Sequence, residues 1–458
     1  MALWTSAEIA AATGGVASAD FSVDDVTFDS REAEAGSLFI ALKGASTDGH
    51  RFVDDVFSRG AAGAIVSSPV AHPHVLVDDT MAALEALGRA ARARTEARVI
   101  GVTGSVGKTG TKEMLGDALA RTAPGKTHRS VKSYNNHTGV PLSLARMPAD
   151  TRFGVFEMGM NHAGELAALT RMVRPHAAIV TTVASVHLEF FDSEEGIADA
   201  KAEIFQGLEP GGVAIIPHDN RHHARLRAAA EAQGARIVSF GLSSDADVHA
   251  RERMRTPTGG TFVTARLVER ELSFTIGQPG EHLVSNALAV LAAVEAVGGD
   301  VALAGLALAD MGGLGGRGAR FMAKLAGGGE ALVIDESYNA NPTSMRATLK
   351  MLGEEPVARR IAVLGEMGEL GAGAAELHAG LADPVVEAGV EAAILVGAGM
   401  APLADALEDR TEIVHVDSVA AAREALDKVL GPGDAVLIKG SNFVGLARLV
   451  AGLRGGTA

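Results

Sequence analysis

Short apolar runs alternate along the chain with longer stretches in which apolar residues recur at helical spacing. In the middle of the chain, the runs that favour buried strands lie at 99–103, 154–158, 177–183, 213–217 and 236–241. Helical patterns, such as the one at 111–120, separate these runs. Strands that alternate with helices predict a mainly parallel sheet covered by helices.

The two ends of the chain carry related patterns. Near the N-terminus, strand-like runs at 37–42 and 63–67 are broken by Gly and Asp turns, and a helical pattern follows at 81–94. Toward the C-terminus the alternation is more regular, with strands expected at 331–337, 361–365, 392–397, 412–416 and 435–439. This second series predicts a smaller Rossmann-like domain.

A glycine-rich segment at 311–320 separates two of these regions, because it is too rich in glycine to lie inside a helix or strand. The length of 458 residues corresponds to about three domains of ordinary size. We therefore predict an α/β protein of three domains. They are a mixed α/β domain at 1–97, a central phosphate-loop ATPase domain with a mainly parallel sheet at 98–316, and a Rossmann-like domain at 317–458.

Composition narrows the class of protein. Hydrophobic residues make up 47% of the chain and charged residues 21%, which suits a soluble globular protein with sizeable cores. The net charge of −15 argues against a nucleic-acid partner, because such proteins present basic surfaces. The absence of cysteine excludes disulfides, thiolate chemistry and cysteine-ligated zinc.

The N-terminal residues lack a basic region followed by an apolar run, so they do not predict a signal peptide. No apolar stretch approaches the roughly 18 residues of a membrane span. We therefore expect a cytoplasmic protein that acts on small molecules, and we expect it to be a monomer.

The motif with the clearest chemistry is Gly-Val-Thr-Gly-Ser-Val-Gly-Lys-Thr at 101–109, after an expected strand and before an expected helix. Backbone N–H groups of such a loop and the helix N-terminus bind phosphate. Lys108 would reach the β- and γ-phosphates of a nucleotide, and the Thr109 hydroxyl would bind Mg²⁺. Val102 stands where the strict pattern has glycine, so the loop is a variant. A chance glycine turn is disfavoured, because strand, loop and helix follow in the required order.

Residues further along the chain extend this site. Glu157 ends an expected strand, where ligands of parallel sheets bind, and His187 follows the next strand. A carboxylate and a neutral imidazole are suitable ligands for a second Mg²⁺. The alternative interpretations are a buried, hydrogen-bonded acid at Glu157 and a loop histidine without a ligand role at His187. Lys201 lies on a helical stretch, where the simplest interpretation is an exposed lysine paired with Asp199 or Glu203.

Further motifs accompany the phosphate loop along nearly the whole chain. They are Asp-Ser-Arg at 29–31, Leu-Phe-Ile-Ala-Leu-Lys-Gly at 38–44, Asp-Gly-His at 48–50, Asn-Asn-His-Thr-Gly-Val-Pro at 135–141, Glu-Met-Gly at 157–159, Ala-Lys-Ala-Glu-Ile at 200–204, Ser-Tyr-Asn-Ala-Asn-Pro at 337–342 and Leu-Ile-Lys-Gly-Ser at 437–441. In this order they resemble the Mur ligase family of ATP-dependent ligases. The combination is far more specific than any one motif.

The resemblance implies roles for residues in all three domains. ATP would be bound by Gly104, Ser105, Gly107, Lys108, Thr109, Asn286, Arg317, Asp335 and Glu336. The ligands of two Mg²⁺ ions would include Thr109, Glu157, His187 and a carbamylated Lys201, and the catalytic set would be Lys108, Glu157, His187 and Lys201. Substrate would be bound by Ser30, Arg31, Lys43, Asp48 and His50 at its uridine diphosphate, by Asn135 and Asn136 at its muramoyl peptide, and by Tyr338 and Asn339 at an incoming dipeptide.

Within the family, the segment at 337–342 favours the ligase activity that joins D-alanyl-D-alanine to UDP-N-acetylmuramoyl-tripeptide, a step of peptidoglycan precursor synthesis that forms ADP and phosphate. The resemblance implies an acyl-phosphate intermediate. Because an acyl phosphate hydrolyses in water, the third domain is expected to close over the site about a hinge at 312–318. Whether the tripeptide ends in lysine or diaminopimelate stays open.

Other activities are weaker alternatives. The nearest is a Mur ligase that adds the third amino acid, but the Asp-Asn-Pro-Arg segment of its diaminopimelate-using members is missing. A folylpolyglutamate synthetase is disfavoured by the uridine-nucleotide motifs of the first domain. A non-catalytic nucleotide-binding regulator on the same scaffold is disfavoured by the presence of Lys108, Glu157, His187 and Lys201. A kinase or simple ATPase would need only the phosphate loop.

Overall fold

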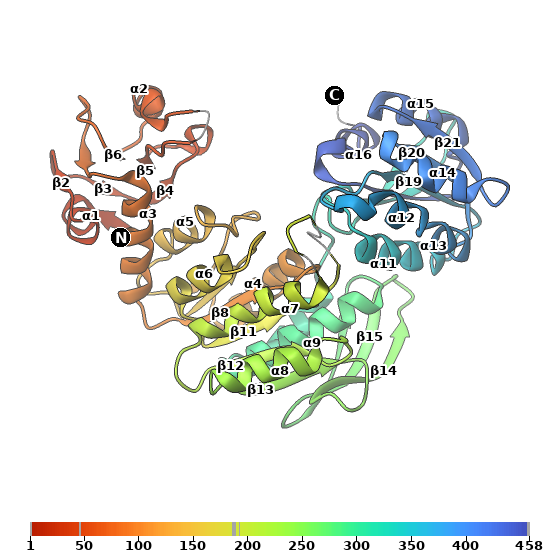
Figure 1. Ribbon diagram of the computed structural model, residues 1–458, viewed down its shortest axis with the longest axis horizontal. Helices are drawn as coiled ribbons and strands as arrows, with labels where there is room; N and C mark the ends of the chain where they lie inside the picture. Colours follow the sequence, from red (N-terminus) through yellow and green to blue (C-terminus); the bar gives the residue numbers. More distant parts are fainter. Residues whose placement is uncertain (1, 45–46, 186–188, 192, 456–458) are drawn as a thin grey trace.

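The computed structural model describes residues 2–44, 47–185, 189–191 and 193–455. In Figure 1, three bodies follow in chain order, with the first in red, the central one in yellow to green and the third in blue. Within the described residues, each body contains its own largely parallel sheet flanked by helices. The prediction of a three-domain α/β protein is confirmed.

The first domain is built on a sheet with the strand order β2-β7-β6-β5-β4, in which only the β2–β7 pair is antiparallel. Its elements are β1 (Trp4–Thr5), α1 (Ser6–Thr13), β2 (Val16–Ala17), β3 (Ser22–Val23), β4 (Asp25–Thr27), β5 (Ser37–Ile40), α2 (Val53–Ser58), β6 (Gly63–Val66), β7 (His74–Leu76) and α3 (Thr80–Ala93). Leu38 and Ile40 pack with α1 and α3 on one face, and Phe39 packs with α2 on the other. Burial on both faces explains why β5 reads as a continuous apolar run.

The central sheet has the order β16-β15-β14-β13-β12-β11-β8-β10-β9 among the described residues. Its strands are β8 (Arg98–Thr103), β9 (Thr127–Arg129), β10 (Phe153–Glu157), β11 (Ala177–Val180), β12 (Val213–Pro217), β13 (Arg236–Gly241), β14 (Val248–Arg255), β15 (Thr261–Arg266) and β16 (Glu271–Ile276). Its helices are α4 (Lys108–Thr122), α5 (Gly139–Ala145), α6 (Glu165–Val173), α7 (Glu194–Ala202), α8 (His223–Ala232), α9 (Glu281–Ala296) and α10 (Val301–Ala309). Helices α4, α9 and α10 cover one face of the sheet, and α5 to α8 cover the other.

One edge of this sheet differs from the prediction. The pairs β14–β15 and β15–β16 are antiparallel, and no apolar run marks these strands. The sequence of β14, Val-His-Ala-Arg-Glu-Arg-Met-Arg, is mostly polar because most of the strand is exposed. A strand with one open face carries no continuous apolar signal.

The third domain has the order β17-β18-β22-β19-β20-β21 among the described residues, with only β17 antiparallel to its neighbour. Its strands are β17 (Ala319–Lys324), β18 (Glu330–Glu336), β19 (Arg360–Gly365), β20 (Val390–Val396), β21 (Glu412–Val416) and β22 (Ala435–Lys439). Its helices are α11 (Pro342–Gly353), α12 (Ala374–Ala379), α13 (Ala382–Glu387), α14 (Ala401–Leu407), α15 (Val419–Val429) and α16 (Ala447–Leu453). Helices α11 to α14 cover one face and α15 and α16 the other, as a Rossmann-like arrangement requires.

The first domain rests on the central domain through α3 and α5, which lie side by side in Figure 1. Leu142 and Ala145 of α5 belong to the same core as Leu84 and Leu87 of α3. Trp4 Nε1 also donates to the Ala145 carbonyl over 2.8 Å. In the described part of the chain, every helix is too short or too polar to span a bilayer.

Candidate active site

The predicted phosphate loop connects β8 to α4, and two of its glycines have a positive φ, +147° at Gly104 and +89° at Gly107. A Cβ at Gly104 would lie 1.9 Å from Thr181 Oγ1, and a Cβ at Gly107 would lie 2.9 Å from Asn286 Nδ2. Both positions therefore require glycine. Lys108 Nζ turns back and donates to the Gly104 carbonyl over 2.7 Å. The loop, its lysine and the predicted Asn286 thus lie together.

Ser105, also predicted at the phosphates, anchors the loop. Its Oγ donates to the Ala184 carbonyl over 3.0 Å and accepts from the Ala184 N–H over 3.0 Å. Its own N–H donates to the Thr182 carbonyl. The side chain therefore holds the loop against the segment after β11.

Thr109, Glu157 and Asn135 form a hydrogen-bonded set beside this loop. Thr109 Oγ1 donates to Glu157 Oε2 over 2.9 Å, and Asn135 Nδ2 donates to Glu157 Oε1 over 2.7 Å. Glu157 is 1% exposed. Because β8 and β10 are parallel neighbours, their carboxyl ends bring α4 and Glu157 to the same edge of the sheet. The arrangement offers hydroxyl and carboxylate oxygens next to a phosphate cradle.

Lys201 is buried on α7, so the interpretation of an exposed lysine is wrong. Its two expected partners have other contacts, since Asp199 pairs with Arg225 at 2.8 Å and Glu203 accepts N–H groups from the start of α6. Burial lowers the pKa of Lys201 well below its usual value, and the charge of Lys108 lowers it further. His187 lies outside the described residues.

Residues at the start of the third domain reach the central domain. The Arg317 guanidinium lies 4.0 Å from the ring centre of Tyr338, and its Nη2 donates to Ser133 Oγ over 3.1 Å. Ser133 Oγ in turn lies 3.5 Å from Thr109 Oγ1. Arg317 and Tyr338, both predicted site residues, therefore lie next to the set around Glu157. Ser133 was not predicted.

The two acids predicted near the ribose differ in their surroundings. Asp335 accepts hydrogen bonds from the Gly316 N–H and from Ser337, so its oxygens hold the linker and the turn after β18. Burial raises the pKa of Glu336, although Lys439, 3.6 Å away, opposes this effect. Lys439 was part of a motif but had no predicted role, and its position shows that it belongs beside Glu336.

The uridine-nucleotide residues predicted in the first domain fall into two groups. Lys43 and Asp48 form a β-bridge, and His50 Nδ1 lies 2.6 Å from Asp48 Oδ1 while its Nε2 accepts from the Ser67 N–H. In the second group, Arg31 donates to Asp29 over 2.7 and 2.9 Å, which holds the pKa of Asp29 at about 2. The neighbouring Ser30 carbonyl accepts from Arg59.

Two further predicted residues, Asn136 and Asn339, accept hydrogen bonds from nearby backbone N–H groups. Asn136 Oδ1 accepts from the N–H groups of Thr138 and Gly139 at the start of α5, over 3.3 and 2.9 Å. Asn339 Oδ1 accepts from the Ala340 N–H over 2.8 Å. Their side-chain oxygens stabilise the turns that carry the motifs.

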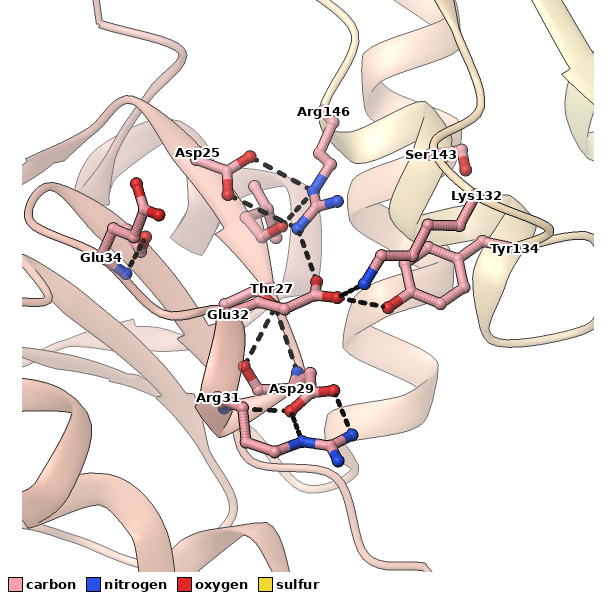
Figure 2. A network of polar contacts seen from close by, with 12 residues as sticks. Asp25, Thr27, Asp29, Arg31, Glu32, Glu34, Lys132, Tyr134, Ser143 and Arg146 are labelled. Carbon is pink, nitrogen blue, oxygen red and sulfur yellow. Dashed lines mark hydrogen bonds and ion pairs between the residues drawn. The ribbon is translucent and has the colours of Figure 1, made fainter. Parts of the chain in front are cut away.

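The predicted residues thus converge in part. The central-domain set and Arg317 lie together, whereas the uridine-nucleotide residues lie on the first domain. Unpredicted residues connect the two parts, namely Glu32, Lys132, Tyr134 and Arg146 (Figure 2). The sequence carried no signal for Glu32, because only the folded chain brings it against the segment that precedes Asn135.

Comparisons with known proteins show which family the chain resembles. The chain matches the models for the Mur ligase family catalytic domain at residues 22–103, the Mur ligase middle domain at 102–294 and the Mur ligase glutamate ligase domain at 316–442. A UDP-N-acetylmuramoyl-tripeptide–D-alanyl-D-alanine ligase of Rickettsia prowazekii is 32% identical over 98% of this chain and 99% of its own length. The enzyme of that name from Escherichia coli is 34% identical over 84% of this chain and 83% of its own length.

Among solved structures, MurF from Acinetobacter baumannii superposes with a TM-score of 0.85 at 33% identity, and the match covers 98% of each chain. The likeness therefore extends over all three domains. The chain belongs to the Mur ligase family.

Proposed function

We propose that this protein is the ATP-dependent ligase that joins D-alanyl-D-alanine to UDP-N-acetylmuramoyl-tripeptide, with ADP and phosphate as the other products. Relatives with this activity in their names match nearly the whole chain. Within the molecule, the observation that carries the proposal is the hydrogen-bonded set of Thr109, Glu157 and Asn135 beside the phosphate loop. It supports the proposal because it offers hydroxyl and carboxylate oxygens beside the loop that would bind the nucleotide.

The reaction takes place in two steps. A carboxylate oxygen of the tripeptide attacks the γ-phosphorus of ATP, and the bond between that phosphorus and ADP breaks. Lys108 and the N–H groups of the loop stabilise the charge on the transferring phosphoryl group. The amine of D-alanyl-D-alanine then attacks the acyl carbon, loses a proton and displaces phosphate.

The donor set suits Mg²⁺, because this ion prefers oxygen ligands and is usually held by one or two protein groups together with substrate phosphates. Thr109 and Glu157 would hold it, and when bound it would neutralise phosphate charge. Among the described residues, no group of three or more His, Asp or Glu side chains could by itself hold a metal ion. The lowered pKa of Lys201 supports carbamylation there, since the neutral amine is the form that reacts with carbon dioxide.

We also propose domains at 1–97, 98–316 and 317–458, with closure of the third domain about residues 312–318. In this linker, φ is +74° at Gly316 and +85° at Gly318, and Leu314 forms bridges to Arg317 and Gly318. Small-angle scattering should show compaction when an ATP analogue and the UDP-linked substrate are both bound. An unchanged radius of gyration would contradict closure.

The activity is tested by phosphate release from ATP with UDP-N-acetylmuramoyl-tripeptide, in the presence and absence of D-alanyl-D-alanine. We expect release that requires both substrates and a product heavier by the dipeptide. Release without either substrate would identify an ATPase instead. Activity with the dipeptide precursor and a free diamino acid would identify the ligase that adds the third residue.

A further inference from the structure

The segment of residues 130–136, called here the bridging segment, is contacted by all three domains. Glu32 contacts it from the first domain, Lys112 and Glu157 from the central domain, and Arg317 from the third. It lies between β9 and α5, next to the phosphate loop. A segment in this position can transmit a change at one site to another.

Glu32 makes polar contacts from the first domain that are drawn in Figure 2. It ends the 3₁₀ turn Ser30–Glu32, which also contains two of the five residues predicted at the uridine nucleotide. Its Oε1 accepts hydrogen bonds from Lys132 Nζ and, over 2.9 Å, from Tyr134 Oη. Burial raises the pKa of Glu32, but the hydrogen bonds from Lys132 and Tyr134, together with the charges of Lys132 and Arg146, lower the pKa overall. The carboxylate is therefore ionised and held by the bridging segment.

A second contact reinforces this junction. Arg146, at the end of α5, lies 3.7 Å from Glu32 Oε2 and 3.2 Å from Asp25 Oδ1, and its Nε donates to the Val26 carbonyl. The Tyr134 ring lies 5.9 Å from the Phe28 ring. The 3₁₀ turn is thus positioned on the central domain by charge, hydrogen bonds and ring packing.

The other side of the bridging segment reaches the phosphate and metal site. Lys112, fully buried on α4, donates to the Ser130 and Lys132 carbonyls over 2.9 and 2.8 Å. Asn135, directly after Tyr134, donates to Glu157. The path from Glu32 to Glu157 therefore runs through side chains of neighbouring residues in one short segment.

We propose that Glu32 is a positioning residue that couples occupancy of the uridine-nucleotide site to the ATP site through the bridging segment. This inference depends on the proposed function, because that function defines the two ligands. A substrate that orders the turn Ser30–Glu32 strengthens the contacts of Glu32 with Lys132 and Tyr134. These contacts fix Asn135, and hence Glu157, in the arrangement that receives ATP. By linkage, ATP must then strengthen binding of the UDP-linked substrate to the same degree.

The test measures the dissociation constant of UDP-N-acetylmuramoyl-tripeptide by calorimetry, with and without saturating magnesium and a non-hydrolysable ATP analogue. In the unaltered protein we expect the analogue to tighten substrate binding at least about fivefold. In Glu32→Gln the ratio should fall to about one, while the affinity for the analogue alone changes less than about twofold. Tyr134→Phe, which keeps the ring against Phe28 and removes one hydrogen bond, should give an intermediate ratio.

Glu34→Gln is the matched control, because this exposed carboxylate lies two residues after Glu32 in the first domain. It should keep the ratio of the unaltered protein. A Glu32→Gln protein that folds and keeps the full ratio would overturn the inference, as would an unaltered protein that binds the substrate equally well with and without the analogue. If Glu32→Gln does not fold, a full ratio in Tyr134→Phe overturns it. An unaltered protein that binds no UDP-linked substrate would overturn the proposed function itself.

Discussion

Thr109 Oγ1 donates a 2.9 Å hydrogen bond to Glu157 Oε2, which joins the first turn of α4 to the last residue of β10. The two residues are 48 positions apart in the chain. They meet because β8 and β10 are paired in parallel, with Glu157 opposite Val102. The site is thus built on two largely buried strands of the central sheet, where a small shift of one side chain is resisted by packing.

Glu157→Gln should lower kcat about 10²- to 10³-fold, because a neutral amide is a weaker ligand than a carboxylate for the Mg²⁺ that would neutralise the phosphate charge. The shape is kept, so the thermal midpoint should change little. Steady-state phosphate release measures the effect. Glu165→Gln, a half-exposed acid at the start of α6, should keep activity within about twofold. Comparable activity in both variants would contradict a role for Glu157.

Gly104→Ala should abolish ATP binding, since the new Cβ would lie 1.9 Å from Thr181 Oγ1 and φ is +147°. The loop must move to admit it. Gly110→Ala, in the first turns of α4, meets nothing within 4 Å and should stabilise the protein by about 0.5–1 kcal/mol. Titration with a fluorescent ATP analogue distinguishes them. Normal affinity in Gly104→Ala would show that the loop conformation is not required.

Glu355→Gln should destabilise the contact between the central and third domains. Glu355 is 3% exposed, and its Oε2 accepts from Arg255 of β14 over 2.9 Å and from Arg320 of β17 over 2.6 Å. Removing the charge leaves two arginines without their counter-ion, at a cost of about 3 kcal/mol in the free energy of unfolding. Urea unfolding measures this cost. The exposed pair of Lys350 and Glu281 joins the same two domains, and Glu281→Gln should cost less than about 1 kcal/mol.

The stability of the protein should fall between pH 6.5 and about pH 4, in part because of His128. Burial lowers the pKa of this ring to about 4, whereas in the unfolded chain it is about 6.5. Between these two pH values only the unfolded state binds the proton. The contribution of His128 to the free energy of unfolding is therefore complete above pH 6.5 and is lost as the pH falls toward 4. In full, this contribution is about 3 kcal/mol.

His128→Gln isolates this contribution, because the amide can still donate to the Ser143 carbonyl that His128 Nε2 contacts over 2.7 Å. Its free energy of unfolding, measured across this pH window, should fall less steeply than that of the unaltered protein. Parallel curves for the two proteins would show that His128 titrates normally in the folded state.

Much of the parallel framework could be predicted from local pattern. The expected strands at 213–217 and 236–241 coincide with β12 and β13, and the helix expected at 81–94 is α3, shifted by one residue. Its start follows from Asp79, whose Oδ1 accepts from the N–H groups of Met81 and Ala82. The strands β14 to β16, at one end of the central sheet, escaped prediction, because polar residues cover their open face.

By itself, the sequence determined the apolar strands, the phosphate loop and the family, since each is carried by short motifs or a series of short motifs in a fixed order. A positive φ at Gly104 and Gly107 is a local property of the backbone. Only the tertiary structure decided that Lys201 is buried, that Asp335 binds the linker and that Glu32 meets Lys132 and Tyr134. Those facts depend on which distant segments pack against one another, and pairing between segments 100 or more positions apart leaves no periodicity in the sequence.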